Sequence, residues 1–176
     1  MRTYIIVDMG DTALLIDKHA AHERMVFDRL KKNDRVVMSQ TLLEPCLWRP
    51  DPEQRQLLEE NAAALEKAGF SLEAFGEDDM IVRGVPEALD PANTVSALEE
   101  ICEKLRRGGR DLVPDEILQT VACKSAIKAG WDTDPRELQV LVDKVVSGEI
   151  KYCPHGRPVA VSLTRKELDK QFRRIV

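Results

Sequence analysis

The sequence predicts an α+β fold with two lobes, and three observations indicate this class. Apolar residues make up 43% of the 176 residues, and only 5% are aromatic. Segments with the alternation of strands stand beside segments with the spacing of helices. The pattern changes near residues 48 and 112. We therefore expect one lobe built from both chain ends, residues 1–47 and 113–176, and an inserted lobe of residues 48–112.

The first lobe is predicted to open with a hairpin of two largely apolar strands, residues 4–9 and 13–16, joined by a turn at Gly10 and Asp11. Residues 19–32 have helical spacing, and residues 35–45 return to strand character. Thr164 and Glu167 form the pattern of a capping box at the start of a closing helix. Helices are also expected over residues 114–129, 135–146 and 164–176. A turn followed by a strand is expected over residues 152–163.

The inserted lobe is predicted to be a helix, a hairpin and a second helix. Residues 52–68 have one apolar helical face, and Gly69 follows at the position that ends a helix. Residues 70–86 read as a hairpin around a Gly-Glu-Asp-Asp turn. Residues 93–107 form another amphipathic helix. Because this unit has its own apolar pattern, we expect it to pack as a separate lobe.

The charge of the chain is uneven. The net charge of −5 and the pI near 5.3 exclude a uniformly basic nucleic-acid-binding domain. Between residues 51 and 116 acidic residues outnumber basic ones, whereas basic residues dominate from residue 151 onward. The C-terminal end is therefore the part expected to approach phosphates.

The four cysteines are scattered and form no Cys-x-x-Cys pair, which favours a reducing cytoplasm over a disulfide framework. No signal peptide precedes the first strand, and no apolar run approaches the length of a membrane span. Since a strand follows Met1 almost directly, the sequence is interpreted as a domain of a longer protein.

The run "DKHAAHERMVFD" contains five side chains that bind divalent metals in proteins. Asp17 ends the predicted strand and His19 begins the helix, so both are expected at the same strand end. His19 and Glu23 are four residues apart and share a helical face. Such a pair forms a chelate suited to Zn²⁺ or Mn²⁺. His22 and Asp28 point elsewhere, and His22 is expected at the surface or beside the ligands.

A second group of metal-binding side chains stands near the other end of the chain, in "CPHGRP". Cys153 and His155 lie two residues apart in a turn stiffened by two prolines. With Asp17, His19 and Glu23 they would supply five ligands, more than one tetrahedral structural zinc requires. The surplus predicts either two neighbouring metal positions or one position open to substrate. A thiolate at Cys153 favours Zn²⁺ over Mg²⁺ there.

Ordinary structural roles fit the same residues. A His or Glu at a helix start often caps the helix or is solvated, and a lone Cys is often a small buried apolar residue. Leu42 and Leu43 fit core positions of a strand. Arg157 fits a structural role in a tight Gly-Arg-Pro turn. The residue patterns alone leave both interpretations open.

Several motifs occur together in an order that is specific to one family. "DKHAAHERMVFD" resembles the DQHA-x₂-E-x₄-E endonuclease motif in the C-terminal domain of MutL mismatch-repair proteins. "ACKSAIKAG" (residues 122–130) and "CPHGRP" (residues 153–158) match two further motifs of that domain. "QTLLEP" (residues 40–45) is similar to the sliding-clamp-binding motif of bacterial members. The resemblance covers essentially the whole chain.

The resemblance implies a DNA-nicking endonuclease that hydrolyses phosphodiesters with Mn²⁺, with Zn²⁺ in a structural or regulatory position. It also implies that the lobe of both chain ends forms a homodimer and that the inserted lobe is external and regulatory. ATP would act only through an N-terminal ATPase domain outside this sequence. The implied catalytic residues are Asp17, His19 and Glu23. The residues implied at or beside the metals are Asp17, His19, Glu23, Cys153, His155, Cys123, Arg157 and Asp28.

The implied partners are a second copy of the chain, the sliding clamp, MutS and double-stranded DNA, in a bacterial cytoplasm at the nucleoid and away from membranes. The clamp would be bound through Gln40, Leu42, Leu43 and Pro45. We expect Gln40 and Leu42 to be replaceable by Ala without loss of the fold.

Two positions depart from the family motif. Lys18 replaces the usual Gln and is expected to point away from Asp17 and His19. Asp28 stands where the second Glu belongs, and its shorter side chain favours a packing or ion-pair role. The alternative function is a MutL dimerisation module without cutting activity, whose zinc is structural. Members from methyl-directed repair lack the Asp-x-His-x₃-Glu set, whereas this chain has it.

Overall fold

The computed structural model describes residues 3–32, 37–108, 114–126 and 134–174. The chain divides into two compact units. We call residues 1–25 with 126–176 the terminal unit, and residues 26–125 the middle unit. Each is described by itself.

These boundaries differ from the predicted lobes, because residues 26–47 and 113–125 join the middle unit. The reason is pairing over a distance in sequence: strand β3 (Ser39–Trp48) pairs with β5 (Asp79–Pro86). Helix α5 (Pro114–Ser125) likewise packs against α4 (Thr94–Gly108). Helix α5 ends at Ser125, earlier than the helix predicted for residues 114–129. Residues 127–129 of that prediction lie outside the part of the chain that the structure describes. The assignment of dimerisation and regulation to two lobes stays a prediction.

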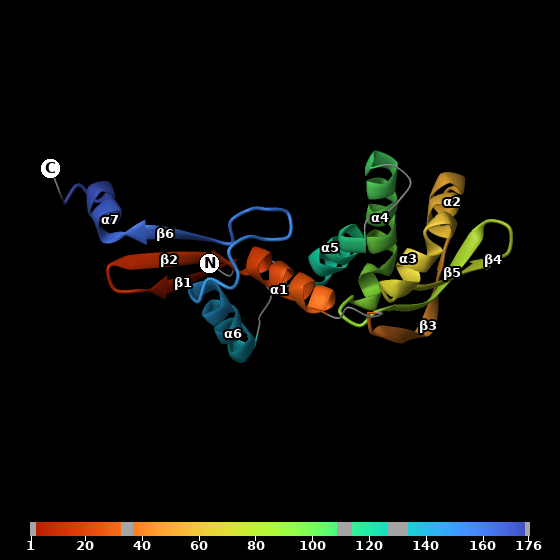
Figure 1. The fold of residues 1–176 in the computed structure, drawn as a ribbon, viewed down its shortest axis with the longest axis horizontal. Helices are drawn as coiled ribbons and strands as arrows, with labels where there is room; N and C mark the ends of the chain where they lie inside the picture. The colour runs from red at the N-terminus through yellow and green to blue at the C-terminus, as the bar shows by residue number, and fades with distance from the viewer. Residues whose placement is uncertain (1–2, 33–36, 109–113, 127–133, 175–176) are drawn as a thin grey trace. The chain divides into compact units, whose positions relative to one another are not determined.

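The terminal unit is built on an antiparallel sheet of β1 (Tyr4–Asp8), β2 (Thr12–Asp17) and β6 (Ala160–Thr164). Figure 1 shows β2 between the other two strands. The hairpin predicted for residues 4–16 is confirmed. Helix α6 (Pro135–Val146) has the predicted bounds. Helix α7 (Arg165–Gln171) has the predicted capping box but ends earlier than the predicted helix of residues 164–176.

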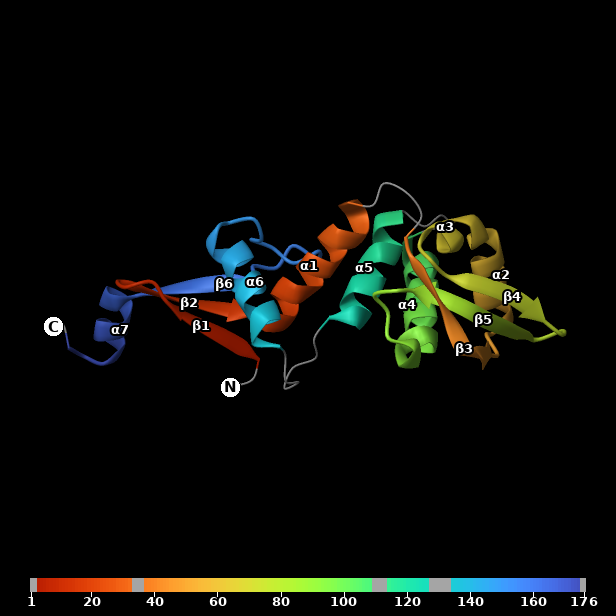
Figure 2. The ribbon, with the colours of Figure 1, turned by 90° about the horizontal axis from the view of Figure 1, so that it is seen from below.

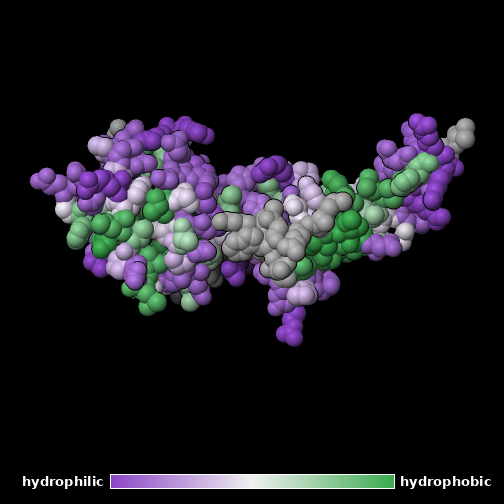
Figure 3. Space-filling model, turned by 180° about the vertical axis from the view of Figure 1, so that it is seen from behind, coloured by the Kyte–Doolittle hydropathy of each residue, from purple (hydrophilic) through white to green (hydrophobic). Residues whose placement is uncertain are grey.

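The two faces of this sheet differ in burial. One face holds Ile16, which packs with Leu141, Ile150 and Val159 in a core where each is at most 2% exposed. The other face carries the cross-strand row Ile6, Leu15 and Val161, because these residues pair directly across the strands. Ile6 is 62% and Val161 is 57% exposed. Hydrophobic side chains gather over this unit in Figure 3.

Helix α1 (Lys18–Lys32) begins in the terminal unit and ends in the middle unit. The middle unit contains a second antiparallel sheet in the order β3-β5-β4 (Figure 2). Its further elements are α2 (Pro52–Glu60), α3 (Ala62–Lys67), β4 (Ser71–Phe75) and a short 3₁₀ helix, η1 (Pro91–Asn93). None of the helices in the described part of the chain has the length and apolar character needed to cross a membrane.

The single helix predicted for residues 52–68 is interrupted at Asn61. The Asn61 side-chain amide donates a 2.8 Å hydrogen bond to the carbonyl of Leu57, and its backbone N–H bonds to the same oxygen. An Asn side chain that competes for a helix carbonyl weakens the regular ladder. Gly69 ends α3 as predicted, with a φ of 92° that favours glycine.

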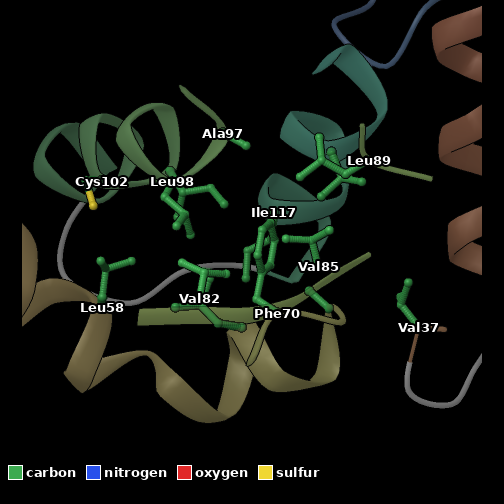
Figure 4. Packing of buried hydrophobic residues seen from close by; sticks show 14 of the residues in the cluster. Val37, Leu58, Phe70, Val82, Val85, Leu89, Ala97, Leu98, Cys102 and Ile117 are labelled. Atoms are coloured by element: carbon green, nitrogen blue, oxygen red, sulfur yellow. The ribbon is translucent and has the colours of Figure 1, made fainter. Parts of the chain in front are cut away.

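The core of the middle unit lies between its helices and its sheet. Figure 4 shows Leu98 and Ile117 pointing toward Val82 and Val85 of β5, and all four residues are fully buried. Cys102 of α4 belongs to the same core, and burial raises the pKa of its thiol to about 12. Cys102 is therefore a neutral packing residue rather than a reactive one.

Candidate metal centre

The segment Cys153–Pro158 forms a tight turn that presents two candidate ligands. The N–H of Cys153 donates to the carbonyl of Arg157 at 2.8 Å, and the N–H of Gly156 donates to the carbonyl of Cys153 at 2.9 Å. Gly156 has a φ of 80°, which a residue with a side chain rarely adopts. The turn thus fixes the spacing between the Cys153 thiol and the His155 ring.

The start of α1 is held beside this turn. The N–H of Asp17 donates to the carbonyl of Val159 at 2.8 Å, and its carboxylate accepts the N–H of Ala20 at 3.1 Å. The second bond is the capping interaction of a helix N-terminus. One turn further on, the guanidinium of Arg24 donates to the carbonyl of Tyr152 at 3.5 Å. Helix and turn are therefore joined at two levels.

Three side chains from these two segments converge. One ligand atom from each of Glu23, Cys153 and His155 lies within 4.8 Å of the others, and we call this group the metal cluster. Oxygen Oε1 of Glu23 lies 3.0 Å from Nδ1 of His155. Glu23 and Cys153 are each only 2% exposed, whereas the His155 side chain is 36% exposed. The cluster is therefore closed on one side and open on the side of the imidazole.

The metal cluster fits a divalent ion on two grounds. Oε1 of Glu23 is buried without a hydrogen-bond partner among the described residues, because the approach of His155 meets the distance of an ion pair but not hydrogen-bond geometry. A buried carboxylate left in this way is costly unless a cation pairs with it. A thiolate, an imidazole and a carboxylate are also ligands that Zn²⁺ accepts, and three of them leave a fourth position open.

Asp17 and His19 do not belong to the metal cluster. Asp17 caps α1 through its carboxylate, a role that was not predicted for this residue. The structure thus brings together three of the five predicted ligands. A metal role for Asp17 and His19 stays a prediction.

His22 was expected either at the surface or beside the ligands, and the first of these two positions is wrong. His22 is 7% exposed, and its Nε2 lies 3.1 Å from Oε1 of Glu137 on α6. Packing of α6 against this side of α1 removes His22 from water, which no local pattern in the sequence indicates. Glu137 was not predicted for the same reason. Lys18 is also buried, at 5% exposure.

The predicted neighbours of the site fall into two groups. Arg157 is exposed, and its backbone carbonyl closes the turn, so the structural role is observed and the side chain remains accessible. Asp28 and Cys123 are half-buried residues of the middle unit. Their place beside the metal cluster stays a prediction.

The predicted clamp motif, residues 40–45, lies in β3 of the middle unit. Its register breaks between Thr41 and Cys46. Leu42 is 8% exposed and joins the core, whereas Leu43 is fully exposed. The Gln40 side-chain amide donates to the carbonyl of Leu89 at 2.7 Å. It also lies 3.3 Å from the carbonyl oxygens of Pro86 and Glu87, to which it donates as well. The burial of Leu42 and the hydrogen bonds of Gln40 argue against the expectation that both residues can be replaced by Ala without loss of the fold.

The fold and the metal cluster define the class of the chain: an α+β domain in which a buried carboxylate, a buried thiol and an exposed imidazole converge near the end of one of its two sheets. The family model described as "MutL C terminal dimerisation domain" matches residues 1–133. The chain belongs to this family of DNA mismatch-repair domains.

Relatives named DNA mismatch repair protein MutL match nearly the whole chain. The protein of Kosmotoga olearia is 38% identical over 174 residues, which cover 97% of this chain and 29% of the relative. The protein of Heliobacterium modesticaldum is 36% identical, over 98% of this chain and 27% of the relative. The protein of Caldanaerobacter subterraneus is 34% identical, over 98% of this chain and 30% of the relative. The chain thus spans less than a third of these relatives.

Proposed function

We propose that this chain is a DNA-nicking endonuclease domain of mismatch repair that acts as a homodimer and depends on divalent metal. The observation that carries the proposal is the buried oxygen of Glu23, which has no hydrogen-bond partner among the described residues and faces Cys153 and His155. A domain that dimerised without binding a metal would need no such group. The proposed reaction is hydrolysis of one phosphodiester bond.

The metal cluster would hold Zn²⁺ through Glu23, Cys153 and His155, and Asp17 with His19 would contribute to a Mn²⁺ position nearby. A bound divalent ion lowers the pKa of its water and stabilises charge on the phosphate oxygens. The protein's own part is positioning. Asp17 fixes the first turn of α1, and that turn sets the direction from which Glu23 faces the Cys153–Pro158 turn.

The charge of the two units favours DNA on the terminal unit. The terminal unit has 13 basic and 11 acidic residues, whereas the middle unit has 13 basic and 20 acidic residues. Lys151 and Arg157 are exposed, and in the sequence they flank Cys153 and His155. His155 is the exposed member of the metal cluster. The backbone phosphate would therefore approach from the side of His155, with Arg157 as a steering charge.

Dimerisation is expected through the terminal unit. The row of Ile6, Leu15 and Val161 crosses all three strands, and its outer members are more than half exposed. An apolar face of this kind is typical of an interface that a second copy covers. This row lies on the hairpin of residues 4–16 and on β6.

The sliding clamp would contact the part of residues 40–45 that projects from β3. Leu43 and Pro45 are exposed beside the irregularity in the strand, so they offer an apolar anchor to a partner. Gln40 and Leu42 support that segment from inside the middle unit. This division of roles replaces the expectation that Gln40 and Leu42 make the clamp contact.

Nicking of supercoiled plasmid with Mn²⁺, with and without the clamp, tests the proposal. We expect the parent chain to convert supercoiled to open-circular DNA and Glu23→Gln to lose this activity. Glu137→Gln is the matched control, because it makes the same chemical change in the same unit outside the metal cluster. Equal nicking by the parent and by Glu23→Gln would refute the site assignment.

A structural zinc site in a non-cutting dimerisation domain is the second candidate function. It is favoured by the observation that Asp17 caps α1 and lies outside the metal cluster. Metal analysis separates the two functions. One tightly held Zn²⁺ per chain, together with no Mn²⁺-dependent nicking under any clamp condition, would assign the cluster a structural role.

A further inference from the structure

A groove of about 350 Å³ lies on the middle unit between α2, α3 and β4. Its floor is apolar: Leu58, Phe70 and Met80 line it and are at most 4% exposed. Ala62 and Ala74 also line it, and these short side chains leave room above the floor. The groove can thus receive apolar side chains without rearrangement of the core.

The groove follows the backbone edge of β4. The four consecutive residues 71–74 all line it. Since successive side chains of a strand point to opposite faces, a groove lined by consecutive residues runs along the strand's edge. In the part of the chain that the structure describes, β5 is the only strand paired with β4. The outer edge of β4 therefore presents backbone groups to which a further strand can bond.

The charged residues that line the groove are all acidic: Glu59, Glu66 and Glu73. Glu59 and Glu73, each with a side chain more than half exposed, lie 2.9 Å from Arg55 and Arg83. Carboxylates at this exposure exchange ion-pair partners at little cost. Glu66 makes no ion pair among the described residues. The groove thus combines an apolar floor with a negative rim.

The charge of the whole middle unit acts in the same direction. With 20 acidic and 13 basic residues it attracts a basic partner and repels nucleic acid. A protein segment rich in Lys or Arg is therefore the occupant that the charge selects.

We propose that this groove binds an extended, basic peptide segment of a partner protein, which adds to β4 as a further strand. Alternate apolar side chains of the peptide would point to Leu58, Phe70 and Met80. The intervening Lys or Arg side chains would reach the glutamates of the rim. This inference does not depend on metal binding or on nicking.

A fluorescein-labelled octapeptide that alternates valine and lysine is the probe, measured by fluorescence anisotropy with the whole 176-residue chain. We expect saturable binding with a Kd below about 1 mM. A valine–glutamate peptide should bind at least about tenfold more weakly. A valine–lysine peptide with alternate backbone amides methylated should be weakened as strongly, because it cannot pair with a strand edge.

Matched variants locate the binding. Ala62→Arg places a cation in the groove, whereas Ala63→Arg changes an exposed neighbour that does not line it. Glu66→Gln and Glu60→Gln form a second pair of the same design. We expect at least about tenfold weaker binding for the groove variants and a change below about twofold for the controls. Absence of saturable binding, equal losses in variant and control, or insensitivity to amide methylation would each overturn the proposal.

Discussion

Oxygen Oε1 of Glu23 lies 3.0 Å from Nδ1 of His155, although the two residues come from opposite ends of the sequence. The sheet of the terminal unit explains this approach. Strand β2 leads directly into α1, and β6 pairs antiparallel to β2 with Ile16 opposite Ala160. The segment before β6 must therefore lie beside the segment after β2. A register shift of β6 would separate the two halves of the metal cluster.

The substitution Glu23→Gln should have opposite effects on the metal-free and the zinc-bound protein. Without metal it removes a buried charge whose Oε1 accepts no hydrogen bond, so the free energy of unfolding at pH 8 should rise by roughly 1–3 kcal/mol. With Zn²⁺ it removes a ligand, so affinity should fall at least about tenfold. Urea unfolding with and without Zn²⁺, and competition with a chelator, measure the two quantities.

The control for this experiment is Glu137→Gln, which changes the same group outside the metal cluster at a half-exposed position. It should leave zinc affinity unchanged within about twofold. A fall in both stability and zinc affinity for Glu23→Gln would instead mean that Glu23 stabilises the fold through His155 alone. That result would leave the cluster without a metal role.

Asp17→Asn should separate capping from metal binding. Asn caps helices about as well as Asp, so the free energy of unfolding should change by less than about 0.5 kcal/mol. Nicking with Mn²⁺ should nevertheless be lost, because an amide is a far weaker ligand than a carboxylate. Circular dichroism melts and the plasmid assay provide the two readouts. Full nicking by Asp17→Asn would restrict Asp17 to its observed capping role.

Elements with local signals were predicted well from the sequence. The hairpin of β1 and β2, the capping box at Thr164 and the glycine that ends α3 each depend on residues close together in the chain. Glu23, Cys153 and His155 were also predicted, because their motifs mark chemistry that a core does not require. The metal cluster itself could not be derived from spacing, since β6 determines which segments meet.

Features that depend on distant partners were not predicted. The boundary of the middle unit follows from the pairing of β3 with β5, which no local pattern marks. His22 is buried because α6 brings Glu137 to it. Leu42 and Leu43 are adjacent and chemically identical, but they point to opposite faces of β3, and the packing of the distant core decides which face is buried.

The two halves of the clamp motif should respond differently to mutation. Leu43→Ala with Pro45→Ala should remove clamp stimulation of nicking and leave the melting temperature unchanged, since both side chains are exposed. Leu42→Ala should cost about 2–5 kcal/mol of stability, because it opens a cavity in the core. Thermal melts and clamp titrations test this. Normal clamp stimulation of the Leu43 and Pro45 double variant would exclude the projecting segment as the contact.

Charge on the exposed sheet row should dissociate the homodimer. The double variant Ile6→Lys with Val161→Lys places four like charges on the expected interface, so the dimer should dissociate at least about a hundredfold more readily. The control is Ser162→Lys, an exposed β6 residue on the opposite face from Val161. Sedimentation equilibrium gives the dissociation constants. An intact dimer in the double variant would place the interface elsewhere.

The stability contributed by Asp51 should depend on pH in a defined direction. The backbone N–H of Gln54 and then the guanidinium of Arg106 hold the pKa of Asp51 below its ordinary value of 3.8. A group whose pKa is lowered in the folded state contributes stability above that ordinary value and loses it as pH falls through the folded value.

Asp51→Asn keeps the capping acceptor but removes the charge that faces Arg106. The urea midpoint of this variant should therefore lie below that of the parent at pH 7, and the difference should shrink as pH falls below 3.8. Asp90→Asn is the control, because Asp90 caps η1 and makes no ion pair among the described residues. A difference for Asp51→Asn that stays constant from pH 7 to the acid limit would mean that the ion pair with Arg106 adds nothing to stability.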